Sequence, residues 1–434
     1  MRLTEIRTEK LLGLFDHVVP LNMDERITIV HGPNGYGKTA LLRIVSALFN
    51  RQFSVLLELP FESITMAFDN GEILRLRRGM DSLQEFDQPR SIIIESRQDS
   101  FEVFHLANIT PNSVDEFMPF LTRTGSQEWI DDRTGELLTL NEIAVRFPEH
   151  FPPHVRPRTK EMPASLLSLI EGFTVHYIQA HRLESNEKPL RGNRRDRYIT
   201  PTAAVTRYAA ELANRIQLTL GRYAELSQSL DRSFPHRLVA APGSQLSLDD
   251  LRKNLLQLED RQKKLTDVGL LDRESDPFYS VHVADASKLD VLSIYVADAR
   301  RKLGVFDDLY SRISLFQKLI SKRFLFKTML IDKQEGFIFR TRKNKPLAAT
   351  SLSTGEQHEL VLLYEMLFRV ETNALIVVDE PEISLHIAWQ EQFLKDLREI
   401  TQLSKFDVLI ATHSPQIISD RWDLTVELQA PTDA

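Results

Sequence analysis

The sequence contains no cysteine among its 434 residues, which excludes disulfide bonds, thiolate catalysis and cysteine-ligated zinc. It also lacks any apolar run that approaches the ~20 residues needed to span a bilayer. Residues 1–5 lack the apolar core of a signal peptide, so we expect a cytoplasmic protein with no membrane partner. A net charge of −7 argues against a protein coated in nucleic acid, but a local basic groove remains compatible with it.

The composition is that of a globular protein, with 42% hydrophobic and 26% charged residues, and the length suggests two or three domains. Long amphipathic patterns cover residues 208–230, 248–265 and 291–323 and predict helices. Sustained heptads are absent, so a long coiled coil is not supported. A helical arm and a compact helical subdomain are equally good interpretations of this region.

The chain is organised around residues 26–40. Residues 27–30 are apolar and β-branched, which predicts a buried strand, and residues 40–49 follow helical spacing. Between them lies a match to G-x-x-x-x-G-K-[ST], and this order of strand, loop and helix is typical of a phosphate-binding loop. A glycine-rich turn before an ordinary helix is the alternative. The predicted nucleotide contacts are Gly32, Pro33, Asn34, Gly35, Tyr36, Gly37, Lys38, Thr39 and Ala40.

The chemistry of this loop follows from its residue types. Glycines allow backbone N–H groups to turn toward phosphate oxygens, and the helix N-terminus adds positive potential. Lys38 is expected to reach the β- and γ-phosphates, and the Thr39 hydroxyl is expected to bind Mg²⁺. The sequence therefore predicts ATP and Mg²⁺ as ligands.

A second motif begins with the apolar run 374–378, which predicts a buried parallel strand. Asp379 ends that strand, where ligands bind in open α/β sheets, and is a candidate Mg²⁺ ligand. Glu380 follows it and is a candidate general base for the attacking water. Two acids could also simply cap a following helix. Together with the phosphate-binding loop, they favour ATP hydrolysis.

Residues 351–357 read SLSTGEQ and open the apolar helix 360–370. A serine hydroxyl and glycine N–H groups at a helix N-terminus form an anion site. The same residues also predict a capping box, with Ser353 as the cap and Glu356 as its partner. These two interpretations are compatible with each other.

At this point the sequence resembles the ABC-type ATPases, whose signature motif is Leu-Ser-Gly-Gly-Gln. The resemblance implies that Ser353, Thr354, Gly355 and Glu356 of a second protomer close over the γ-phosphate, giving a dimer or higher homo-oligomer around ATP. His413 follows the apolar strand 407–411 and resembles the catalytic switch histidine, although a lone histidine is usually structural. Gln179 resembles the glutamine that meets both Mg²⁺ and the attacking water, with His181 as an alternative.

The long separation between phosphate-binding loop and signature resembles the SMC, RecF and OLD branch of this class. The resemblance implies an α/β P-loop NTPase of ABC type, built from two lobes with an antiparallel β flank and a helical insertion. We expect an N-terminal lobe over residues 1–201, a helical insertion over 202–326 and a C-terminal lobe over 327–434. The resemblance is strong at the two ends and poor in the middle.

OLD nucleases carry a C-terminal nuclease domain, for which the sequence after His413 has no room, so we expect no nuclease activity in this chain. The chain resembles the stand-alone ATPase subunits of the PARIS and Septu phage-defence systems. That resemblance implies control of a separately encoded effector, such as a nuclease. The alternative is a RecF- or SMC-like ATPase that binds DNA in repair or recombination. Two basic clusters, residues 191–197 and 340–345, are candidates for DNA contact or are solvated loops.

Overall fold

The computed structural model describes residues 1–78, 91–97, 99–104, 111–124, 128–133, 137–139, 143, 147, 150, 162–178, 201–240, 247–272, 289–384 and 387–430. The chain forms two compact units, which we describe separately. Unit 1 comprises Met1–Arg182, Asn186–Asn193 and Val370–Ala434, and unit 2 comprises Leu183–Ser185 and Arg194–Arg369. These units divide the chain differently from the three segments 1–201, 202–326 and 327–434, which stay a prediction.

The central sheet of unit 1 is parallel, with its strands in the order β11-β15-β16-β3-β17. Its middle strands are buried almost throughout, as expected for parallel strands covered on both faces. The strands are β3(Ile27–His31), β11(Val175–Ile178), β15(Leu375–Asp379), β16(Asp407–Ala411) and β17(Thr425–Glu427). The predicted runs 27–30, 374–378 and 407–411 therefore all form strands of one sheet.

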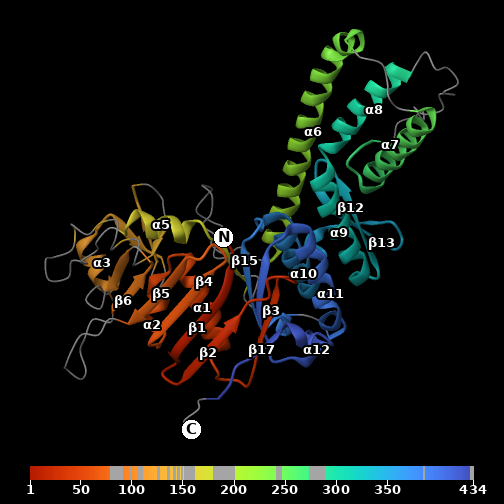
Figure 1. Ribbon diagram of the computed structural model, residues 1–434. Coiled ribbons are helices and arrows are strands. Elements are labelled where there is room, and N and C mark those ends of the chain that lie inside the picture. Colours follow the sequence, from red (N-terminus) through yellow and green to blue (C-terminus); the bar gives the residue numbers. More distant parts are fainter. Residues whose placement is uncertain are drawn as a thin grey trace, which may run out of the picture. The chain divides into compact units, whose positions relative to one another are not determined.

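A six-stranded antiparallel sheet forms the β flank of unit 1, in the order β2-β1-β4-β5-β6-β7. Helix α1(Lys38–Phe49) follows β3 (Figure 1) and is buried on nearly every side. Its core side chains pack with those of both sheets. The flanking strands are β1(Leu3–Leu11), β2(Phe15–Pro20), β4(Ser63–Phe68), β5(Ile73–Arg78), β6(Ser91–Glu95) and β7(Ser100–Phe104). The predicted antiparallel flank is thus present.

A smaller sheet in unit 1, in the order β10-β9-β8, has its own core around the fully buried Trp129. It consists of β8(Leu121–Arg123), β9(Glu128–Asp131) and β10(Leu137–Thr139), with α3(Pro111–Phe117) beside it. The other α-helices that the structure describes in unit 1 are α2(Phe53–Glu58), α5(Ala164–Glu171), α11(Ile387–Ser404) and α12(Pro415–Ile418).

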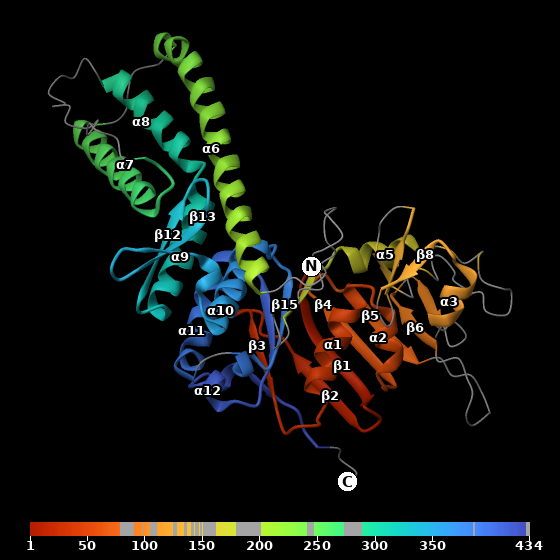
Figure 2. The ribbon, with the colours of Figure 1, turned by 180° about the vertical axis from the view of Figure 1, so that it is seen from behind.

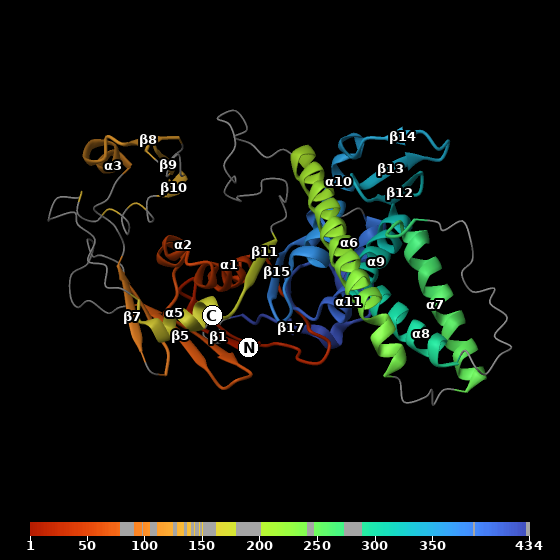
Figure 3. The same ribbon diagram turned by 90° about the horizontal axis from the view of Figure 1, so that it is seen from above.

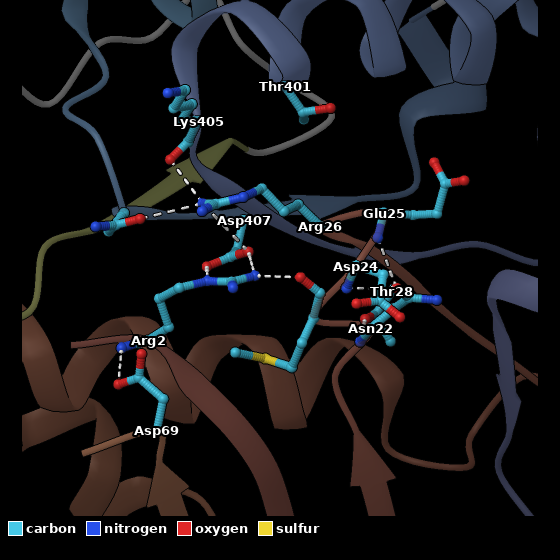
Figure 4. A network of polar contacts seen from close by, with 12 residues as sticks. Arg2, Asn22, Asp24, Glu25, Arg26, Thr28, Asp69, Thr401, Lys405 and Asp407 are labelled. Carbon is cyan, nitrogen blue, oxygen red and sulfur yellow. Dashed lines mark hydrogen bonds and ion pairs between the residues drawn. The ribbon is translucent and has the colours of Figure 1, made fainter.

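A buried ion pair fastens the first strand to the central sheet (Figure 4). The Arg2 guanidinium donates to both carboxylate oxygens of Asp407 at 2.8 and 2.6 Å, and to the Met23 carbonyl at 2.9 Å. The hydrogen bond to Asp407 raises the pKa of Arg2 above its ordinary value. Arg26 approaches the same carboxylate at 3.8 Å and donates to the Lys405 carbonyl. Two cations therefore depend on one buried carboxylate.

Unit 2 contains the long helices. Figures 1 and 2 show α6, α7 and α8 side by side, and Figure 3 shows the small antiparallel sheet β12-β13-β14. A π-helix, Glu365–Arg369, continues directly from α10. The elements are α6(Pro201–Val239), α7(Leu248–Val268), α8(Leu289–Gly304), α9(Asp307–Arg323), β12(Lys327–Asp332), β13(Gly336–Thr341), β14(Pro346–Leu347) and α10(Thr354–Tyr364).

The single helix predicted over residues 291–323 is wrong, because the structure forms two helices there. Helix α8 ends at Gly304, and α9 begins at Asp307. Phe306 N–H donates to the Leu303 carbonyl in the turn between them. Glycine has a low helix propensity, and Asp307 and Asp308 favour a new N-terminus at this point. The apolar spacing continued across the break and concealed it.

Gly336 begins β13 with a φ of +81°, and a Cβ there would lie 2.8 Å from the carbonyl carbon of Ala209 in α6. We expect Gly336→Ala to destabilise unit 2 by about 2 kcal/mol, because backbone conformation and close approach both oppose a side chain. Thermal or urea unfolding measures the change. Gly221→Ala in α6 is the matched control, since nothing lies within 4 Å of a Cβ there. An equal loss in both variants would contradict the explanation.

Candidate nucleotide-binding site

The predicted phosphate-binding loop joins β3 to α1 in unit 1, and all nine predicted residues lie in it or at the start of α1. Gly37 occupies the N-cap position with a φ of 87°, and a Cβ there would come within 2.9 Å of the Leu11 side chain. Tyr36 is held from both sides, since its carbonyl contacts His17 Nε2 at 3.0 Å and its ring lies 5.3 Å from that of Phe15. The loop conformation is thus fixed by the first two strands.

The side chains of this loop differ in what they can offer a nucleotide. Pro33, Asn34 and Gly35 are exposed, whereas the Ala40 side chain is buried in the core, so only its backbone N–H can face a phosphate. Lys38 donates to the carbonyls of Gly32 at 2.7 Å and Pro33 at 3.0 Å. Its ammonium therefore lies directly against the loop.

Burial lowers the pKa of Lys38 from its ordinary value, while the charges of Glu380, Asp379 and Glu382 oppose this shift. Asp379 ends β15, and Glu380 and Glu382 come directly after it. Lys38 is thus a desolvated cation near several anions, an environment in which a phosphate group would form strong charge-assisted hydrogen bonds.

The two predicted protein ligands of Mg²⁺ are adjacent. The Thr39 hydroxyl donates to Asp379 Oδ1 at 3.2 Å, across the end of β15. A hydroxyl and a carboxylate fit Mg²⁺, which binds through one or two protein oxygens and keeps water and phosphate oxygens as its other ligands. The donor set therefore suits the ion that the motifs predict.

Tyr177 in β11 is a contact that the sequence analysis missed. Its hydroxyl donates to the other Asp379 oxygen, Oδ2, at 3.2 Å. Burial raises the pKa of Tyr177 above its ordinary value, so it remains a protonated donor. Burial also raises the pKa of Asp379, and the hydrogen bonds from Thr39 and Tyr177 oppose that shift. Tyr177 thereby fixes the orientation of the Asp379 carboxylate.

Glu380 and His413, the predicted base and switch histidine, also lie together. Glu380 has a φ of 44°, a left-handed conformation that is uncommon for a residue with a side chain and is often found at functional sites. His413 Nδ1 lies 3.6 Å from Glu380 Oε1 and 3.3 Å from Glu382 Oε1. Glu382 received no role in the sequence analysis. The signal that could have identified it is that it is a third acid within four residues, after Asp379 and Glu380.

The signature segment lies in unit 2 and forms the capping box that the sequence predicted. Ser353 caps α10, and Glu356 Oε2 accepts from the Ser353 N–H at 2.8 Å. Lys327 donates to the same oxygen at 2.6 Å. Burial acts to raise the pKa of Glu356, but the hydrogen bonds from Lys327 and Ser353 outweigh it and hold the value below the ordinary range. Ser353, Thr354 and Gly355 are exposed.

Several sequence predictions fall outside the described residues. These are Gln179, its alternative His181, and the basic cluster 191–197. In the described part of the chain, no helix combines the length and apolar character that crossing a membrane requires.

The parallel sheet, the loop between β3 and α1, and the acids at the end of β15 define a mixed α/β P-loop NTPase of ABC type, which confirms the predicted fold class. Residues 184–419, more than half of the chain, match the family described as "AAA domain, putative AbiEii toxin, Type IV TA system". The chain belongs to this family. The matched segment includes the signature, Asp379, Glu380 and His413, whereas the phosphate-binding loop precedes it.

No curated protein matches the chain. Solved structures with a similar arrangement include the Smc head domain from Pyrococcus furiosus bound to the C-terminal domain of ScpA, at 11% identity and a TM-score of 0.35, covering 96% of this chain and 91% of that one. The SMC head domain from Thermotoga maritima has 11% identity and a TM-score of 0.33, with the same coverage of 96% and 91%. These are distant likenesses, and the family assignment does not depend on them.

Proposed function

We propose that the chain binds ATP with Mg²⁺ and hydrolyses it to ADP and phosphate. The observation that carries this proposal is the meeting of Lys38, Thr39 and Asp379 with Glu380 and His413 at one end of the parallel sheet. Lys38 and the loop N–H groups would hold the phosphates. Thr39 and Asp379 would hold Mg²⁺, which neutralises charge on the phosphate oxygens when bound.

In this proposal Glu380 accepts the proton of the attacking water, and His413 contacts the γ-phosphate. A general base must lie within hydrogen-bond reach of the proton that it takes. The Glu380 side chain is 29% exposed, and that of His413 is 48% exposed, so both can meet a substrate. Gln179 would assist at the metal and the water.

We further propose that two copies of the chain close around ATP. The exposed N-terminus of α10, with Ser353, Thr354 and Gly355, would bind the γ-phosphate held by the other copy. Glu356 supports this segment through its hydrogen bonds to Ser353 rather than by direct contact. Closure and opening of this pair would be the output of the ATPase cycle.

The partner that this cycle controls is proposed to be a separately encoded effector, in anti-phage defence in the cytoplasm. The sequence resemblance to phage-defence ATPases supports this. The family description names a toxin of a type IV toxin–antitoxin system, which supports a defence role but names no separate effector.

A DNA-binding ATPase is the second candidate, and one surface of unit 2 favours it. Phe326 is 63% exposed, and the Arg342 guanidinium lies 4.5 Å from the centre of its ring. Lys343 and Lys345 are exposed on the same β13–β14 connection. An exposed aromatic ring among cations is suited to stacking a base beside a phosphate backbone.

A pull-down distinguishes the two candidates. The tagged full-length chain is expressed with its native flanking genes, and the Lys38→Ala variant serves as the nucleotide-binding control. We expect to recover a second, nuclease-like protein, and we expect the amount recovered with the Lys38→Ala variant to differ. Recovery of the chain alone, together with ATP hydrolysis that DNA stimulates, would favour the DNA-binding candidate instead.

A further inference from the structure

The Glu382 carboxylate contacts three groups in the segment that follows β16. Its Oε1 accepts from the Thr412 hydroxyl at 2.7 Å and from the His413 backbone N–H at 3.2 Å. The same oxygen lies 3.3 Å from His413 Nδ1. The Glu382 side chain is only 9% exposed, and Thr412 is fully buried. One buried oxygen therefore holds both the backbone and the ring of His413.

These contacts begin where the backbone pairing of the sheet ends. The last hydrogen bond between the two segments runs from Glu380 N–H to the Ala411 carbonyl at 2.9 Å. Beyond it, the Thr412 hydroxyl accepts from Ser414 N–H at 3.0 Å, and Gln390 Nε2 donates to the Glu382 carbonyl at 3.1 Å. The Glu382 side chain thus connects the segments after β15 and β16 through Thr412 and His413, and the other two bonds hold each segment in place.

The second Glu382 oxygen, Oε2, is buried and has no hydrogen-bond partner among the described residues. A buried carboxylate oxygen without a hydrogen-bond partner lowers the stability of the fold. If this position served packing alone, an apolar side chain would therefore be more stable here. The position of the charge beside His413 offers a functional reason for a carboxylate here.

We infer that Glu382 is a positioning residue that sets the ring orientation of His413. Nδ1 faces two carboxylates, those of Glu380 and Glu382, which hold the N–H on this side of the ring. Nε2 is the nitrogen left to face the γ-phosphate, and it donates to a phosphate oxygen when it too carries a proton. This inference rests on the proposed function, in which His413 contacts that phosphate.

A double-mutant cycle on ATP hydrolysis by the full chain tests the inference, using Glu382→Ala, His413→Ala and the double variant. We expect Glu382→Ala to lower kcat about tenfold or more, because a displaced catalytic group loses its effect steeply with distance. The KM for ATP should remain within about threefold, since the phosphate-binding loop is intact. The double variant should be no slower than His413→Ala alone.

Thr412 provides a matched pair outside the cycle, because its hydroxyl donates to Glu382 Oε1 at 2.7 Å and so holds the carboxylate that is tested. Thr412→Val removes the hydroxyl and keeps the shape, and we expect it to lower kcat in the same direction. Thr412→Ser keeps the hydroxyl and should retain kcat. Circular dichroism and ATP binding of each variant separate a loss of folding from a loss of positioning.

The outcomes distinguish this inference from the proposed function. If Glu382→Ala lowers kcat by the same factor with and without His413, Glu382 does not act through His413 and the inference is overturned. An unchanged kcat in Glu382→Ala, with His413→Ala impaired, also overturns it while leaving the proposed function intact. An unchanged kcat in His413→Ala would instead remove the proposed role of His413 itself, and this inference with it.

Discussion

Glu380→Gln is expected to lower the turnover of ATP about a thousandfold, which is the range that a positioned general base contributes. The carboxamide has the shape of the carboxylate but cannot accept the proton of the attacking water. ATP binding should persist, because Lys38, Thr39 and Asp379 are unchanged. Steady-state hydrolysis and nucleotide binding measure the two quantities. Glu371→Gln, an exposed acid before β15, is the matched control and should retain full turnover.

The same variant tests closure around ATP. Glu380→Gln should retain ATP and accumulate a larger species in light scattering with ATP, because hydrolysis no longer reopens the pair. Lys38→Ala should not form that species, since it lacks the cation that holds the phosphates. If the two variants behave alike in ATP-dependent association, two copies do not close around the nucleotide.

Asp407→Asn is expected to destabilise unit 1 by about 3 kcal/mol, since removing one partner of a buried ion pair leaves the other charge uncompensated. The Asp407 side chain is 7% exposed and that of Arg2 is 15% exposed, so water cannot replace the lost carboxylate readily. Arg26, at 3.8 Å, loses the same anion. The midpoint of thermal unfolding, with and without ATP, measures the loss.

Arg398→Gln is the control for that measurement. Arg398 pairs with Glu25 at 2.8 Å, but its side chain is 47% exposed, and exposed pairs contribute on the order of 0.5 kcal/mol. A similar shift in both variants would mean that burial does not set the importance of the Arg2–Asp407 pair. A shift confined to Asp407→Asn would show that the buried Arg2–Asp407 pair holds the first strand against the central sheet.

The sequence predicted the parts of the fold whose signals are local. The strand, loop and helix of residues 26–40 and the strand before Asp379 form as expected, because apolar runs and glycine spacing act within a few residues. The roles of Glu380, His413 and Gln179 stay predictions. Tyr177 was missed because its partner Asp379 lies 202 positions away, and no local pattern reports such a contact.

The same reason conceals the ion pair of Arg2 with Asp407, which are 405 positions apart. Charges of opposite sign occur throughout a sequence, and only the fold selects which of them become neighbours. The break between α8 and α9 was missed for the opposite reason. Its sequence signal was local, but it was weaker than the apolar helical spacing on either side of it. Long-range polar contacts and short helix breaks are thus the features of this fold that its sequence does not reveal.

The order of strands in the central sheet constrains how the protein is synthesised. Strand β3, which leads into the phosphate-binding loop, pairs only with β16 and β17 in the described structure, and both are encoded far downstream. At ordinary ribosome speeds this apolar strand waits on the order of a minute before its partners emerge. During translation both of its edges stay unpaired, and such edges attract other chains. We therefore expect the nascent chain to need protection, from chaperones or from its own early antiparallel sheet, until β17 emerges.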